Sequence, residues 1–134
     1  MFKALLIAAG ILAIHGAAQA DVKLTADFVG PGTYSPTTGC TKLEAIEKSD
    51  AAPNIATYPL TLTREGTRGW EGGCDFSSIR EVKPNTFEGK MQCSEGAENF
   101  EETVTFRRLD ANRIEVASGS EALVYERCKA LKGN

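Results

Sequence analysis

Apolar and polar side chains alternate along much of the chain, which is the pattern of β-strands that bury one face. The clearest example is 100–107, where Phe100, Val104 and Phe106 alternate with polar residues such as Glu101. Clusters of Gly, Pro, Asn and Ser separate such segments, as turns separate strands. The pattern predicts strands over 22–28, 58–63, 86–93, 100–107, 113–117 and 122–128, with a short extended segment over 33–35. A further strand is predicted to begin at 68–71 and to continue over 74–82.

About eight short strands, spaced near ten residues apart, predict an all-β fold, either a small antiparallel barrel or a sandwich. We favour the barrel because it removes the free strand edges that make a soluble β protein prone to aggregation. The pair Gly72-Gly73 predicts a bulge or a close approach of two backbones. One short helix is predicted over 41–49, because Thr41 and Glu44 form a capping-box pattern at its start.

The first 20 residues carry a different pattern. Lys3 precedes the apolar run Ala4–Ile14, and Ala18-Gln19-Ala20 has the form of a signal-peptidase site. The run is about half as long as the roughly 20 apolar residues of a membrane-spanning helix, and no later stretch is long enough to span a bilayer. We therefore predict a signal peptide over 1–20, a single β domain over 21–134, and a periplasmic or secreted protein.

Four cysteines, Cys40, Cys74, Cys93 and Cys128, all lie in the predicted domain. An even number in a small exported domain predicts two disulfides, and the absence of any C-x-x-C pair disfavours a zinc site. Cys74 and Cys93 flank a predicted hairpin that turns near 83–85, where simple pairing offsets them slightly. We prefer Cys74–Cys93 with Cys40–Cys128. The alternative joins Cys40 to Cys74 and Cys93 to Cys128.

The charged residues are spread out, with 15 Lys and Arg against 18 Asp and Glu. The basic patch that a nucleic-acid partner needs is not visible. The one histidine, His15, lies in the predicted signal peptide, so the domain lacks the imidazole of Ser-His-Asp and Cys-His sites. No phosphate-binding or calcium-binding loop occurs. We predict no catalytic residue, no metal and no cofactor.

The segment Arg64–Gly73 is the best candidate for binding, because it holds the only tryptophan of the chain, which is flanked by glycines and arginines. Trp and Arg are enriched at the centres of protein interfaces. We therefore take Arg64, Arg68, Trp70 and Glu71 as candidate binding residues. A competing interpretation, which we favour for Trp70 itself, places its side chain in the core or as a plug at one barrel end.

Three functions remain open on the sequence. The leading hypothesis is an exported, non-catalytic binding module, such as a protein-binding or inhibitor-like barrel of the cell envelope. A second is a carrier that holds a small apolar ligand inside the barrel. Its cavity would be lined by Phe28, Leu62, Phe76, Val104, Phe106 and Val116. A third, less favoured, is a cell-wall glycosidase using two of the carboxylates that are dense between Glu71 and Glu102.

The order of several motifs resembles a group of small four-cysteine exported proteins of proteobacteria. The matching segments are Gly32-Thr33-Tyr34, Cys40, Thr63–Gly66, Trp70–Cys74, Cys93–Gly96 and Tyr125–Cys128. These motifs are structural. The resemblance implies a periplasmic setting and does not imply an activity.

Overall fold

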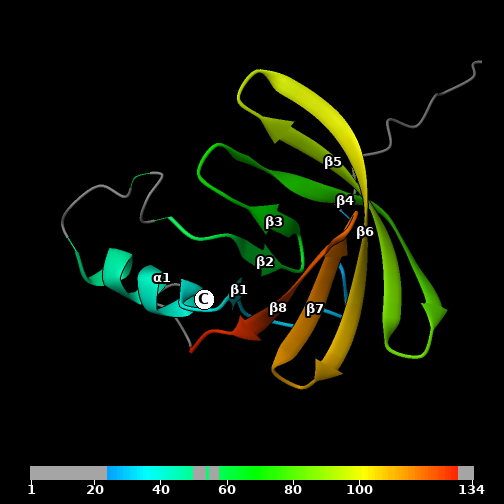
Figure 1. Cartoon of the computed structure of the whole chain (residues 1–134), viewed down its shortest axis with the longest axis horizontal. Helices are drawn as coiled ribbons and strands as arrows, with labels where there is room; N and C mark the ends of the chain where they lie inside the picture. The colour runs from blue at the N-terminus through cyan, green and yellow to red at the C-terminus, as the bar shows by residue number, and fades with distance from the viewer. Residues whose placement is uncertain (1–23, 50–53, 55–57, 130–134) are drawn as a thin grey trace, which may run out of the picture.

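The computed structural model describes residues 24–49, 54 and 58–129, and shows a closed antiparallel barrel of eight strands in chain order (Figure 1). The predicted signal peptide 1–20, most of the loop 50–57 and the tail 130–134 lie outside these residues. The elements are β1 (Tyr34–Pro36), α1 (Gly39–Lys48), β2 (Thr61–Thr63), β3 (Gly66–Arg68), β4 (Gly72–Lys83), β5 (Thr86–Glu95), β6 (Glu98–Asp110), β7 (Arg113–Ser118) and β8 (Glu121–Arg127). The predicted all-β barrel is therefore confirmed.

The barrel closes where β8 pairs with β1, with Tyr34 opposite Arg127 and Pro36 opposite Tyr125. The helix α1 follows β1 directly, and a disulfide from Cys40 to Cys128 joins its first turn to the end of β8. This bond fastens the beginning of the barrel to its end, as the preferred cysteine pairing predicted.

The second predicted disulfide, Cys74–Cys93, is also confirmed, and the alternative pairing is wrong. The expected offset between the two cysteines is absent, because they lie directly opposite each other on β4 and β5. Two register shifts in β4, at Phe76/Ser78 and Glu81/Lys83, account for this. Each bulge adds one residue to β4, so together they cancel the offset that simple counting from the turn gives.

The predicted strand over 22–28 is wrong for the part that the structure describes. The N–H of Val29 bonds to the carbonyl of Ala26 at 3.1 Å, so the chain turns here instead of extending. Both residues are buried, and Phe28 stacks on Phe87 with ring centroids 4.3 Å apart. The alternation marked real burial, but the segment buries its side chains by entering the end of the barrel and not by pairing as a strand.

An arginine inside the barrel holds this segment in place. Arg108 donates from Nε to the carbonyl of Phe28 at 2.8 Å and from Nη2 to the carbonyl of Val29 at 2.7 Å. Its guanidinium also lies 5.8 Å from the centre of the Tyr34 ring. Phe28 also packs against Phe76 and Phe106, so this end of the barrel is closed by a plug of aromatic side chains.

Two further boundaries differ from the prediction. The helix begins at Gly39 and not at Thr41, and Thr38 precedes it in a left-handed conformation without a side-chain cap. The strand predicted to run from 68–71 on into 74–82 is divided into β3 and β4, because the chain reverses over 69–71. The close backbone approach predicted at Gly72-Gly73 is confirmed. A Cβ atom on Gly72 would lie 1.9 Å from the carbonyl oxygen of Ser94.

Candidate binding site

Three hairpin turns lie at the end of the barrel opposite the aromatic plug, because turns alternate between the two ends of an up-and-down barrel. They connect β3 to β4, β5 to β6 and β7 to β8 (Figure 1). Two adjoining hollows open between these hairpins, with volumes of about 410 and 290 Å³. They share Leu60, Thr67, Cys74 and Glu102, and we refer to the two together as the mouth.

The larger hollow lies beneath the turn that carries Trp70 and beside the Cys74–Cys93 disulfide. The smaller one enters the barrel, where Met91, Val104 and Val116 line it. Tyr125 also lines this deeper part, and burial raises the pKa of its phenol.

Exposed apolar side chains gather at the mouth. In the part of the chain that the structure describes, seven large apolar side chains are exposed, and four of them line the mouth. These are Leu60, Trp70, Phe100 and Leu123, which are 50%, 48%, 41% and 49% exposed. Contiguous apolar surface of this kind marks interaction sites in soluble proteins.

The placement of Trp70 in the core or as a plug is wrong. Its ring lies on the rim of the mouth, with its centroid 6.2 Å from that of Tyr58. The reversal over Gly69–Glu71 places Trp70 beyond the end of β3, whereas the Cys74–Cys93 disulfide occupies the interior at this level.

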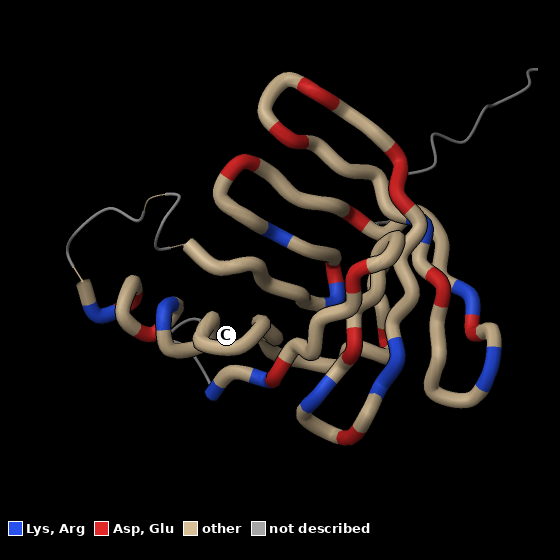
Figure 2. The backbone as a smooth tube through the Cα atoms, viewed as in Figure 1, with Lys and Arg blue, Asp and Glu red and all other residues tan. Residues whose placement is uncertain are grey.

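The charged groups of the mouth are mainly carboxylates. Glu102 is half-buried and accepts a hydrogen bond from the Ser118 hydroxyl. Glu71 and Glu95 line the larger hollow, and Glu121 lines the smaller one. Figure 2 shows acidic positions on the β3–β4 and β5–β6 loops at this end of the molecule. The mouth therefore combines apolar walls with an acidic rim.

Within the described ranges, Arg68 is the only basic residue that lines the two hollows, and three hydrogen bonds hold its guanidinium in place. It donates to Asp75 Oδ1 at 2.6 Å, to the carbonyl of Thr67 at 2.7 Å and to that of Cys74 at 3.0 Å. These bonds fasten β3 to β4 below the Trp70 turn. Arg68 thus supports the rim and does not offset its negative charge.

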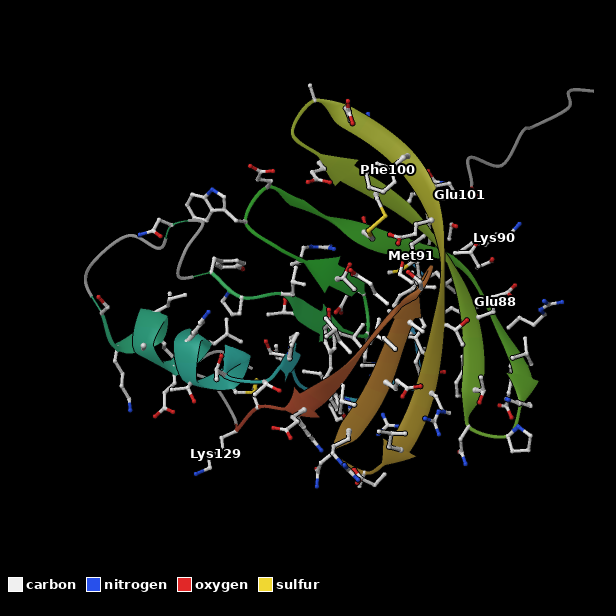
Figure 3. All side chains as sticks on the ribbon, in the orientation of Figure 1. Glu88, Lys90, Met91, Phe100, Glu101 and Lys129 are labelled. Atoms are coloured by element: carbon white, nitrogen blue, oxygen red, sulfur yellow. A yellow bond between two sulfur atoms is a disulfide. The ribbon has the colours of Figure 1, made fainter. Side chains whose placement is uncertain are left out.

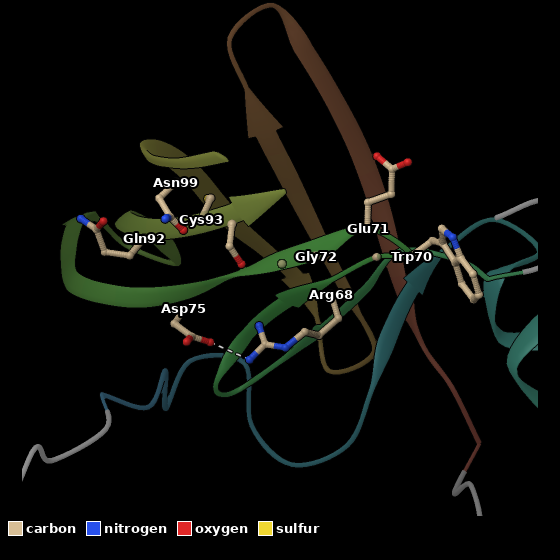
Figure 4. Close-up of a pocket in the computed structure, with 11 residues that line it drawn as sticks. Arg68, Trp70, Glu71, Gly72, Asp75, Gln92, Cys93 and Asn99 are labelled. Atoms are coloured by element: carbon tan, nitrogen blue, oxygen red, sulfur yellow. Dashed lines mark hydrogen bonds and ion pairs between the residues drawn. The ribbon is translucent and has the colours of Figure 1, made fainter. Parts of the chain in front are cut away.

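On the outer face of the same strands lies a polar depression of about 710 Å³ (Figure 4). The register places Arg68, Gly73, Ser94 and Asn99 in one row across β3 to β6. Because Gly73 has no side chain, the row is hollow at that point. The surface offers hydrogen-bonding groups, but the ion pair between Arg68 and Asp75 is already formed within it.

The structure does not bring all four candidate binding residues together. Arg68, Trp70 and Glu71 line the mouth. Arg64 lies in the β2–β3 turn, at the other end of the barrel, where Nη2 donates to Asp27 Oδ1 at 2.7 Å. The predicted binding segment Arg64–Gly73 therefore spans both ends of the barrel, because β3 runs from one end to the other.

The ligand cavity predicted from the sequence is filled. Phe76 and Phe106 pack against each other with centroids 5.5 Å apart, and Leu62 and Phe106 are fully buried. Of the lining residues expected for a carrier, only Val104 and Val116 reach the mouth. Leu60, Phe100 and Leu123 are not among the predicted site residues, and Glu102 is predicted only as one of the carboxylates of the glycosidase hypothesis. Their inward direction follows from strand register, which a single sequence does not supply.

One cluster of possible metal ligands occurs among the described residues, formed by Cys74, Cys93 and Glu102. The two sulfurs are joined as a disulfide, so they are not available to a metal and one carboxylate remains. The glycosidase hypothesis stays a prediction.

Comparison with protein-family models, curated proteins and solved structures finds no match to this chain. Among the residues that the structure describes, no helix has the length and apolar character needed to cross a membrane.

Proposed function

We propose that the protein is an exported, non-catalytic binding module that holds a partner protein at the mouth of its barrel. The observation that carries the proposal is the gathering of Leu60, Trp70, Phe100 and Leu123 around one open hollow. An aromatic residue above an apolar pocket is the usual centre of a protein interface. The cost of leaving these side chains in water is offset when a partner covers them.

The proposed setting is the periplasm or the extracellular space. Two disulfides fit an oxidising compartment outside the cytoplasm. The export signal expected over 1–20, and the resemblance to small four-cysteine exported proteins of proteobacteria, support the same assignment.

A small apolar ligand is the second candidate. It is favoured by the deeper hollow of about 290 Å³, whose walls include Met91, Val104 and Val116. That volume is near the lower end of the range for small-molecule sites, which begins at roughly 300 Å³. We favour a protein partner because the exposed apolar surface extends beyond this hollow to Trp70 and Phe100 on the rim.

The proposal is tested by recovery of partners from envelope and host extracts with the domain 21–134 as bait. The variants are Trp70→Ala and Arg68→Ala, and the matched control is Val82→Ala. Val82 is exposed to nearly the same extent as Trp70, 47% against 48%, but does not line the mouth. We expect the control to retain the partner and Trp70→Ala to lose it. Equal recovery with all variants would remove the mouth from consideration.

A further inference from the structure

One wall of the mouth is a strand edge without a neighbour. β6 pairs with β5 along Glu98–Arg107, but its pairing with β7 begins only at Thr105. In the residues that the structure describes, no strand pairs with the other edge of 98–104. This upper half of β6 projects beyond β7 as part of the β5–β6 hairpin (Figure 1).

The backbone groups on that free edge can be assigned from the hairpin geometry. Gly96 and Ala97 form a two-residue turn between Glu95 and Glu98. The pair that closes such a turn, here Glu95 and Glu98, directs its N–H and C=O groups toward the partner strand of the hairpin. Direction alternates along an antiparallel strand. Asn99, Glu101 and Thr103 therefore present their N–H and C=O groups to the unpaired side.

The side chains between these positions face the mouth. Phe100 lies opposite Cys93, beside the disulfide, and lines the larger hollow (Figure 3). Glu102 lines both hollows. A strand added along this edge would direct every second side chain into the mouth, because successive side chains of a strand point to opposite faces.

The charges of the mouth define which strand fits. Glu71, Glu95, Glu102 and Glu121 line it. Arg68, the only basic residue of the mouth in the described part of the chain, is bound to Asp75 and to two backbone carbonyls. A cationic partner would be attracted to this rim and an acidic one repelled. The apolar walls at Phe100 and Leu123 would receive its uncharged side chains. Because side chains alternate, the basic ones would lie on the opposite face of β6, beside the exposed Glu101, and the rim would attract them at longer range.

We infer that the partner binds by adding an extended segment of alternating apolar and basic residues to the free edge of β6, with apolar side chains entering the mouth. Strand addition of this kind takes its affinity from backbone hydrogen bonds and its specificity from pockets for alternate side chains. The inference rests on the proposed function and specifies its mode.

The test uses synthetic eight-residue peptides that alternate Val or Phe with Lys. The control has Glu in place of each Lys. Two further analogues of the basic peptide are N-methylated on alternate residues, one for each edge of the strand. Binding is followed by calorimetry and by the fluorescence of Trp70, the only tryptophan of the chain. We expect the basic peptide to bind more tightly than the acidic one, and only one N-methylated analogue to lose binding.

The matched protein variants are Glu101→Pro and Glu101→Thr. Both remove the contact in which Gln92 Nε2 donates to Glu101 Oε2, but only proline removes the outward N–H. Proline is tolerated at strand edges where that N–H faces solvent. We expect Glu101→Pro to weaken binding about tenfold and Glu101→Thr about threefold or less, since one backbone hydrogen bond separates them.

Equal binding of the two N-methylated analogues, or equal affinity of the basic and acidic peptides, overturns the inference. Absence of binding by any peptide at about millimolar concentration overturns it as well. Such a result would indicate that the glutamates of β6 only guard the edge against aggregation. If a natural partner is still recovered in a Trp70-dependent manner and Glu101→Pro retains it, the proposed function stands and strand addition is wrong.

Discussion

Removing each disulfide separately distinguishes their roles in stability and binding. Cys40–Cys128 joins residues 88 positions apart and fastens the helix α1 to the last strand. Cys74–Cys93 joins residues 19 positions apart, on strands that are already neighbours. The perturbation is a pair of double variants, Cys40→Ala with Cys128→Ala and Cys74→Ala with Cys93→Ala.

The expected magnitudes follow from the loop that each bond closes. On the chain-entropy model, the longer loop contributes about 4–5 kcal/mol to the free energy of unfolding and the shorter loop about 3 kcal/mol. A domain of this size has a total stability of roughly 5–15 kcal/mol. Loss of Cys40–Cys128 should therefore leave a marginal fold, and loss of Cys74–Cys93 a fold that is weakened but cooperative.

The assay is urea unfolding of the two variants and of the wild-type domain, followed by circular dichroism at 25 °C. The midpoint should fall further for the Cys40–Cys128 variant. Binding should weaken more in the Cys74–Cys93 variant, because of the two disulfides only Cys74–Cys93 lines the mouth. If both variants lose the same stability, or the Cys74–Cys93 variant loses more, loop closure does not explain the role of these bonds.

Three further predictions concern the barrel interior. Replacing Arg108 with Met should lower the free energy of unfolding by about 2–4 kcal/mol, because the carbonyls of Phe28 and Val29 lose their charged donor. The matched control Arg107→Met removes an exposed ion pair with Glu115 and should lower the free energy of unfolding by less than about 1 kcal/mol in the same urea titration. An equal loss of stability in the two variants would contradict the role of Arg108 in holding the aromatic plug. Gly89→Val should lower the free energy of unfolding by about 1–3 kcal/mol, because even a Cβ atom at this position would lie 3.0 Å from the ring of Phe106. The measurement is thermal unfolding, and an unchanged midpoint would refute this packing. Burial raises the pKa of Tyr125 above its usual value of about 10, so its contribution to stability is complete below that pH and is lost as the pH rises through the folded-state pKa. Urea unfolding between pH 8 and 11 should show this loss in the wild type and not in Tyr125→Phe, whereas parallel profiles would argue against it.

Period-2 alternation located the strands from β4 onward because these strands are long and have one face in the barrel. The turns between them also carry local signals, such as the Gly96-Ala97 turn between β5 and β6. The same alternation failed over 24–28, the part of the predicted strand 22–28 that the structure describes. There the N–H of Ala26 bonds to the carbonyl of Arg64 at 2.7 Å, and the chain then turns so that Phe28 enters the barrel. Tertiary contacts decided the conformation of this segment.

The candidate site was only partly predictable. Composition singled out Trp70, but its position on the rim depends on the reversal over Gly69–Glu71. Leu60, Leu123 and the neighbouring pair Phe100 and Glu102 come from three distant parts of the sequence and meet only through the fold of the barrel. The bulges of β4 show how sensitive that register is, because they bring Cys74 directly opposite Cys93.

Site-specific photo-crosslinking at two adjacent residues of β8 tests most directly whether the mouth is the binding surface. Leu123 and Val124 are both exposed, at 49% and 37%, but only Leu123 lines the mouth. Benzoylphenylalanine is placed at one position or the other, and the cross-linked segment of the partner is identified by mass spectrometry. We predict a cross-link from position 123 to an extended apolar and basic segment, and little from position 124. Equal cross-linking from both positions, or cross-linking from 124 alone, would contradict binding at the mouth.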